Sequence, residues 1–140
     1  MPETKLALGV RPVNGIASII DIQGELTAFA EQVLMKSYLD ACTPGTCVIL
    51  LNFSDMIYMN SSGIGLIVTL LIRINRDKRQ LFAYGLSEHY QNIFKLTRLD
   101  ESIQVYNNEI EAIKALRFVP SIVEKRSASA EKRPGFFKRR

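Results

Sequence analysis

The chain has 140 residues, of which 47% are hydrophobic and 23% are charged, and its formal net charge is +4. This length suits a single domain with one hydrophobic core, and the composition is that of an ordinary globular protein. Its apolar runs are far shorter than the roughly 20 residues of a membrane-spanning helix, and the N-terminus lacks the apolar core of a signal peptide, so we expect a cytoplasmic protein without a membrane span.

The positive charge is concentrated at the C-terminus. Residues 118–140 contain seven Lys and Arg residues and only two Glu residues, whereas the rest of the chain is close to neutral. A nucleic-acid-binding protein carries a basic stripe on its folded domain, so we expect no direct binding to nucleic acid. The C-terminal stretch lacks apolar periodicity, which predicts one domain at residues 1–117 and a disordered basic tail at 118–140.

Two cysteines, Cys42 and Cys47, flank a Pro-Gly turn. A disulfide framework usually has more cysteines and a secretory signal. A metal site would need further thiols or imidazoles, and His89 is the only histidine. We therefore expect two reduced thiols, no metal and no cofactor.

The first elements are typical of a β-hairpin. Residues 4–12 alternate roughly, as an edge strand does, and Asn14-Gly15 is a strong signal for a tight turn. The apolar run at 16–22 begins a second strand, which closes near Thr27, a residue that can cap a helix.

A first helix is predicted over residues 28–42. Its large apolar residues recur at helical spacing and are expected to form one face; they are Phe29, Val33, Leu34, Tyr38 and Leu39. Lys36 and Asp40 lie off that face, and the proline that follows ends the helix.

A buried strand and a second helix come next. The apolar run at 47–51 predicts the strand, closed by Asn52 and Asp55. A helical pattern then continues to about Asn75, with apolar positions at Ile64, Ile67, Val68, Leu71 and Ile74. Two serines therefore lie where a strand passes into a helix.

The remaining elements alternate in the same way. A strand is predicted at 80–85, a short helix after Ser87, a last strand at 102–106 and a final helix opened by Asn108. The whole order predicts an α/β fold: a mixed, mostly parallel sheet with an N-terminal β-hairpin and four helices.

Serines at such a junction could serve covalent catalysis. A nucleophile elbow has glycine two residues before and two residues after the serine. Ser61 has Met59 and Gly63 at these positions, and Ser62 has no glycine at either. With one histidine and no evident partner acid, we expect no enzyme, and acyl transfer is the least favoured function.

The glycines of the junction could instead belong to a dinucleotide-binding loop. Gly63 and Gly65 follow a strand, but the third glycine of G-x-G-x-x-G is replaced by Val68. That glycine permits close packing of helix on strand, which valine blocks.

A third possibility is regulation by phosphorylation. The N-terminus of a helix has unsatisfied N–H groups and a partial positive charge, so it favours a phosphate by about 0.3–2 kcal/mol. A phosphoserine is nearly a dianion and costs several kcal/mol to desolvate under a bound protein, so it can release a partner. The simplest alternative is that Asn60 or Ser61 only caps the helix.

Three stretches resemble a known family. Residues 52–66, NFSDMIYMNSSGIGL, resemble the signature L-x-x-V-x-x-M-D-S-[ST]-G-[LI]-G of STAS domains of the anti-sigma-factor antagonist type. Residues 24–26 resemble the G-E-L-D that ends the second strand in this family, and residues 93–99 resemble its L-F-x-L-T-G-L segment. The resemblance covers residues 4–117.

The resemblance implies a bacterial partner-switching regulator. In such families the antagonist binds an anti-sigma factor that is also a serine kinase, phosphorylation of one serine ends the binding, and a serine phosphatase restores it. That serine corresponds to Ser61, with Ser62 as the second choice. The implied partner-binding residues are Glu25, Thr27, Asn60, Ser61, Ser62, Gly63 and Gly65.

Three positions differ from the family pattern. Asn60 replaces the aspartate before the serine, Thr27 replaces the aspartate of G-E-L-D, and Arg98 stands where a helix-ending glycine is usual. The first two remove charge from the expected partner surface. The alternative function is a STAS module that is not phosphorylated and acts by docking or by sensing a small ligand such as a nucleotide.

Overall fold

The structure, a computed structural model, describes residues 6–119. Its strands are β1 (Ala7–Val13), β2 (Ala17–Leu26), β3 (Val48–Met59), β4 (Gln80–Tyr84) and β5 (Gln104–Tyr106). Its helices are α1 (Glu31–Ala41), α2 (Ser61–Arg76), α3 (Glu88–Leu96) and α4 (Glu109–Ala115), with short 3-10 helices η1 (Ala28–Ala30), η2 (Leu99–Glu101) and η3 (Leu116–Phe118). The predicted order of elements is confirmed.

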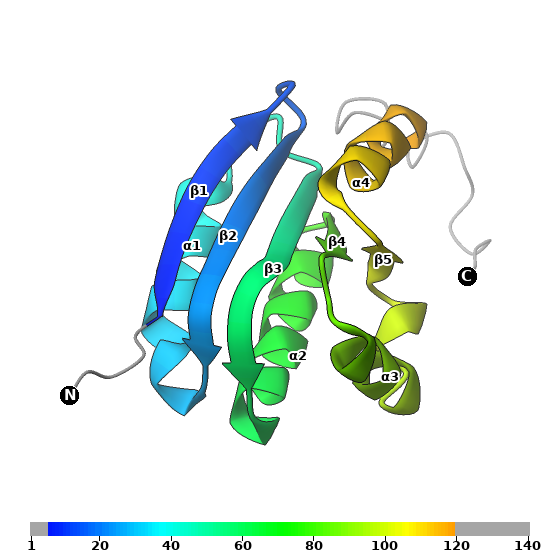
Figure 1. Cartoon of the computed structure of the whole chain (residues 1–140). Coiled ribbons are helices and arrows are strands. Elements are labelled where there is room, and N and C mark those ends of the chain that lie inside the picture. The colour runs from blue at the N-terminus through cyan, green and yellow to red at the C-terminus, as the bar shows by residue number, and fades with distance from the viewer. Residues whose placement is uncertain (1–5, 120–140) are drawn as a thin grey trace.

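The strands form one sheet in the order β1-β2-β3-β4-β5 (Figure 1). β1 and β2 are antiparallel and the other neighbours are parallel, as the sequence predicts. Asn14 and Gly15 form the predicted hairpin turn, with φ values of 43° and 83°. β1 lies at the sheet edge, which is the place in a sheet where Pro12 is tolerated.

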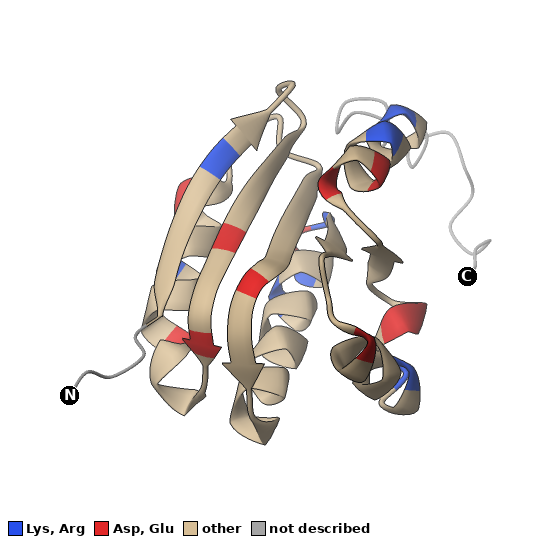
Figure 2. Ribbon diagram, viewed as in Figure 1, with Lys and Arg blue, Asp and Glu red and all other residues tan. Residues whose placement is uncertain are grey.

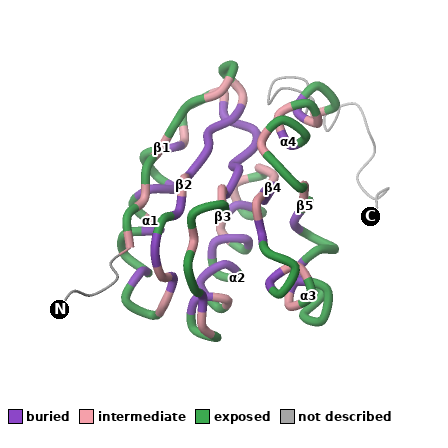
Figure 3. The backbone as a smooth tube through the Cα atoms, viewed as in Figure 1, coloured by how far each residue is buried: buried purple, intermediate pink, exposed green. Residues whose placement is uncertain are grey.

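The helices cover the two faces of the sheet unequally. α1, α2 and α3 pack on one face, over residues of β2 such as Ile20 and Ile22. α4 packs on the other face, over Ala17 and Ile19, near the end of the sheet that carries the β1–β2 turn. At the opposite end of this second face, much of the later part of β3 is exposed (Figure 3).

β3 is longer than predicted. We expected Asn52 and Asp55 to close the strand, but it continues to Met59, because β2 pairs with it until Leu26 lies opposite Met59. Two register shifts interrupt this stretch of the β2–β3 pair. Such shifts break the alternation of buried and exposed residues, so the second half of β3 lacks a strand-like sequence pattern.

The predicted face of the first helix is wrong at three positions. Phe29, Val33 and Leu39 are 95%, 47% and 55% exposed, whereas Leu34 and Tyr38 are buried as predicted. Phe29 belongs to η1, whose three residues per turn place it out of phase with α1. The rest of the buried stripe consists of small residues that a search for large apolar side chains misses: Ala30, Ser37 and Ala41.

The predicted helix caps are confirmed. The Oγ of Ser87 accepts a hydrogen bond from the N–H of Tyr90 at 3.4 Å, and the Oδ1 of Asn108 accepts one from the N–H of Glu111 at 2.9 Å. Thr27 also acts as a cap, although the helix that it caps is η1 rather than α1.

The predicted domain boundary at residue 117 falls within η3. The predicted disordered tail spans residues 118–140, but η3 continues to Phe118. Residues 120–140 lie outside the described residues, and their disorder stays a prediction. Between residues 6 and 119, none of the helices combines the length and the apolar character needed to cross a membrane.

A polar cluster fastens α4 to the sheet. Arg11 of β1 donates hydrogen bonds to Asp21 of β2 at 2.6 and 2.8 Å and to Glu109 of α4 at 3.0 Å. The hydroxyl of Tyr84 donates to Glu109 at 2.7 Å. The hydrogen bonds from Arg11 hold the pKa of Asp21 and that of Glu109 below their ordinary values.

Glu109→Gln is expected to be about 0.5–1.5 kcal/mol less stable than the native chain at pH 7, with the difference shrinking in acid. A lowered pKa stabilises the fold above the pKa of the unfolded chain, near 4, and this stabilisation is lost as the pH falls through the folded-state pKa. Urea unfolding at pH 7 and pH 3 measures both values. Glu111→Gln, an exposed change on the same helix, is the control; an equal deficit of Glu109→Gln at both pH values would contradict the role of the ion pair.

Arg98→Gly is expected to raise the free energy of unfolding by about 0.5–1 kcal/mol. Arg98 follows α3 in the left-handed region, with φ 65°, a conformation that costs an L-residue about 1–2 kcal/mol. The change also removes an exposed ion pair with Glu101, which is worth little. Urea unfolding of Arg98→Gly and Arg98→Ala tests this, because alanine loses the same ion pair but keeps the strain. Equal stability of the two variants would show that φ is not the cause.

Candidate functional site

Ser61 and Ser62 open α2 directly after β3. Asn60 lies between the two elements in an extended conformation, and its Oδ1 accepts a hydrogen bond from the N–H of Gly63 at 2.9 Å. Asn60 is therefore the N-cap, and capping makes no demand on the hydroxyl of Ser61. Both serines are exposed, and within residues 6–119 neither hydroxyl has a hydrogen-bond partner.

The end of β2 lies against this junction. The N–H of Asn60 donates to the carbonyl of Leu26 at 3.4 Å. A Cβ on Gly63 would collide with the carbonyl oxygen of Leu26 and would lie 2.9 Å from the Cγ of Met59. Only glycine therefore fits at position 63, and its role is the close packing of α2 on β2.

The predicted partner-binding residues lie at one end of the sheet, where the arrowheads of β2 and β3 point (Figure 1). Glu25 is paired with Tyr58 across the two strands, and Thr27 follows directly after β2. Gly65 is exposed, and a Cβ there would meet nothing within 4 Å. Of the seven predicted residues, Gly63 alone is buried.

Sequence reasoning missed an apolar part of the same surface. Phe29 is 95% exposed on η1, which contacts α2. On α2, Val68 and Ile72 are 37% and 53% exposed, and their spacing from Ser61 and Gly65 places all four on one side of the helix. The sequence pattern places Phe29 and Val68 on the apolar faces of their predicted helices, which gives no sign that both are exposed.

The beginning of α2 carries no charged side chain. No acidic residue lies in its first turn, and its first charged residue is Arg73, near the opposite end. Figure 2 shows the first turns of α2 without a segment in the colour of Lys, Arg, Asp or Glu. The positive end of the helix dipole is therefore not compensated on α2 itself, which favours an added anion there.

The residues around the serines do not form a hydrolytic triad. His89 is exposed at the start of α3, where its ring packs against Tyr90, and no hydrogen bond joins it to either serine in residues 6–119. Cys42 and Cys47 are free thiols, half-buried and buried respectively. Among the described residues, no group of three or more His, Cys, Asp and Glu side chains could hold a metal ion.

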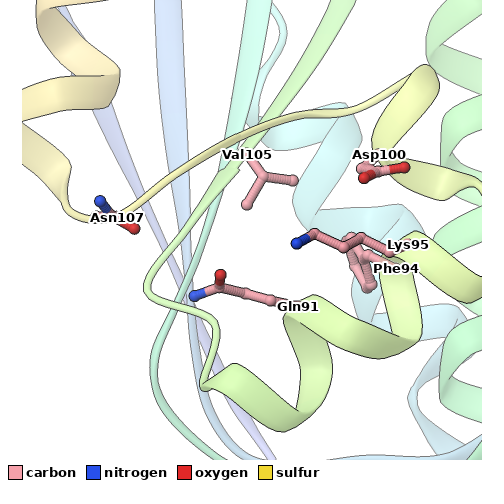
Figure 4. Close-up of a pocket in the computed structure, with 6 residues that line it drawn as sticks. All are labelled: Gln91, Phe94, Lys95, Asp100, Val105 and Asn107. Atoms are coloured by element: carbon pink, nitrogen blue, oxygen red, sulfur yellow. The ribbon is translucent and has the colours of Figure 1, made fainter.

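A recess of about 290 Å³ lies between α3 and the segment that leads from η2 to α4 (Figure 4). Its lining residues are Gln91, Phe94, Lys95, Asp100, Val105 and Asn107. Lys95 is the single cation of this lining, and Asp100 offsets its charge. The recess is at the lower limit of ligand-pocket size, and it lacks the several phosphate-binding donors that a nucleotide needs.

A family model for the STAS domain matches residues 9–112. This match covers well over half of the chain, and the fold just described has the expected sheet and helices, so the chain belongs to the STAS domain family. The resemblance found in the serine motif is confirmed.

Several of the similar proteins are named as antagonists of anti-sigma factors. The anti-sigma-B factor antagonist of Staphylococcus aureus (strain NCTC 8325 / PS 47) is 28% identical over 86 residues, which cover 61% of this chain and 80% of the relative. An anti-sigma factor antagonist from Mycobacterium paratuberculosis has the same fold, with a TM-score of 0.69 at 15% identity over 81% of this chain and 95% of that one. The phosphorylated form of the Bacillus cell fate determinant SpoIIAA gives a TM-score of 0.60 at 21% identity, over 79% and 99% of the two chains. The names describe regulatory proteins.

Gly63→Ala is expected to lower the free energy of unfolding by about 3 kcal/mol or more, because the added methyl group meets a backbone carbonyl that cannot move freely. Gly65→Ala, two residues along the same helix, should raise it by about 0.5–1 kcal/mol, since alanine is the better helix former in open space. Urea unfolding of the two variants measures the difference. Similar effects at both positions would refute the close approach of α2 to Leu26.

Proposed function

We propose that this protein is an anti-sigma factor antagonist that binds an anti-sigma factor with serine kinase activity and is switched off by phosphorylation of Ser61. The observation that carries the proposal is the exposed hydroxyl of Ser61 at the first position of a 16-residue helix whose cap is supplied by Asn60. The hydroxyl is thus free of a structural role and accessible to a phosphate donor.

In the proposed reaction the γ-phosphoryl group of ATP moves to the Oγ of Ser61. ADP leaves, and the hydroxyl proton passes to a base of the kinase. The helix N-terminus stabilises the new charge by about 0.3–1 kcal/mol, so the fold is kept. The same charge costs several kcal/mol to desolvate beneath a partner. The desolvation cost exceeds the stabilisation by the helix N-terminus. Because about 1.4 kcal/mol corresponds to a tenfold change in affinity, we expect phosphorylation to weaken the binding of the partner by a factor of a hundred or more.

The proposed partner surface surrounds Ser61. It contains the predicted residues Glu25, Thr27, Asn60, Ser62 and Gly65, and the exposed ring of Phe29 extends it. Gly63 contributes by packing rather than by contact, since it is buried.

Because the start of α2 is uncharged, phosphorylation would change the charge at this part of the proposed partner surface strongly. Asn60 replaces the aspartate of the family pattern, so the modified serine has no carboxylate beside it in the sequence. A phosphate on Ser61 would be the first anionic group on α2, and it would turn the uncharged start of this helix into a strongly charged one. A serine phosphatase that removes it, and a cytoplasmic location, belong to the same proposal.

The alternative function is a STAS module that docks without being phosphorylated or that senses a small ligand. The recess beside Lys95 and Asp100 is the feature that favours a ligand, but its lining suits a small polar molecule better than a nucleotide. Docking or ligand sensing makes no use of the exposed hydroxyl of Ser61, whereas regulation by phosphorylation does. Phosphorylation is therefore the better supported of the two functions.

Incubation with ATP and candidate anti-sigma factor kinases, followed by mass spectrometry, is expected to show one phosphate on Ser61. Ser61→Ala should abolish the modification and Ser62→Ala should retain it, because the site is the residue directly after the cap. Titration calorimetry with the same kinase should show Ser61→Asp binding about a hundredfold more weakly than Ser61→Ala. No phosphate with any candidate kinase, while binding persists, would favour the alternative function. Phosphate confined to Ser62 would overturn the assignment to Ser61 and support the second-choice serine instead.

A further inference from the structure

The hydroxyl of Tyr90 holds the end of β3. It accepts a hydrogen bond from the backbone N–H of Met59 at 2.9 Å and donates one to the backbone carbonyl of the same residue at 3.4 Å. Tyr90 is 9% exposed, and both hydrogen bonds are buried. Met59 is the last residue of β3 and stands two positions before Ser61.

This contact takes the place of a missing strand. β4 pairs with β3 only as far as Asn52, because the chain turns away at Gly85, where φ is 83°. Beyond that point β3 has β2 on one side, with Leu26 opposite Met59. On the other side, the hydroxyl of Tyr90 provides the donor and the acceptor that a neighbouring strand would otherwise supply to Met59.

α3 is well placed to act as a fixed support. Ser87 caps it by accepting the N–H of Tyr90, and Phe94 packs its ring edge-on against Phe53 of β3, with the ring centroids 6.2 Å apart. α3 is thus attached to β3 both in the middle of the strand and at its end. A displacement of α3 would be transmitted to the backbone that leads into Ser61.

We propose that Tyr90 is a positioning residue for phosphorylation of Ser61, acting through the backbone of Met59. Locked between Leu26 and Tyr90, Met59 fixes the conformation of Asn60 and with it the direction of the first turn of α2. The inference rests on the proposed function, because the reaction that it concerns is phosphoryl transfer to Ser61. Transfer requires the attacking oxygen to be held in line with the phosphate, so looser backbone geometry lowers the rate.

The role of Tyr90 predicts a separation of kinetic effects. Its hydroxyl is buried, so a kinase bound over Ser61 does not touch it, and substrate binding should depend on it little. Loss of the hydroxyl should therefore lower kcat rather than raise KM. A tyrosine with a merely structural role would affect the stability of the chain without changing the kcat of the folded protein.

Tyr90→Phe tests this inference, because it keeps the ring and removes the two hydrogen bonds. Amide exchange at Met59, followed by NMR, is expected to become about tenfold faster. With the kinase that modifies Ser61, kcat should fall about three- to tenfold while KM stays within about twofold. Tyr106→Phe is the matched control, since its hydroxyl makes an exposed hydrogen bond to Gln104 on β5; both measurements should be unchanged.

The outcomes separate this inference from the function on which it rests. If native protein is phosphorylated on Ser61 but Tyr90→Phe has the native kcat, or the native exchange rate at Met59, the positioning role is overturned and the proposed function stands. If no kinase modifies Ser61 in the native protein, both are overturned. A rise in KM with unchanged kcat also counts against the inference, because it would mean direct contact with the kinase.

Discussion

The close approach of α2 to the end of β2 is the constraint on which the serine site depends. Gly63 lets the first turn of the helix lie against the carbonyl of Leu26, at a distance that excludes any side chain. This contact brings the two segments with the predicted partner-binding residues together: the end of β2 and the start of α2. A domain that kept its sheet but lost this contact would separate Glu25 and Thr27 from Ser61.

β3 extends beyond its buried half because β2 pairs with it as far as Met59. The first half of the strand lies between β2 and β4 and carries the core, whereas the second half pairs with β2 alone and is mostly exposed. Hydrogen bonding to β2, and the hydroxyl of Tyr90 at the far end, keep this exposed half in order. The protein thus presents its exposed serines directly after a strand whose second half is mostly exposed, where a second protein can reach them.

Several features of the site could be predicted from the sequence because they depend on neighbouring residues. The cap at Asn60, the helix that follows it and the hairpin turn at Asn14 all follow from short-range backbone chemistry. The serine motif lies within one such local segment, which is why its resemblance to the STAS family could be seen without a structure. Other features could not be predicted: the exposure of Phe29 follows from a 3-10 turn that shifts the helical phase, and the backbone contact of Tyr90 joins residues far apart in the chain.

The sequence by itself therefore determined the order of elements, the helix caps and the position of a serine at the N-terminus of a helix. Periodicity and capping act within a few residues of the chain, so they can be recognised without a structure. The tertiary structure alone decided which apolar residues stay exposed, how far β3 extends and what holds its last residue. These depend on β2, α2 and α3 meeting at one end of the sheet, and a contact between distant segments leaves no periodic signal in either of them.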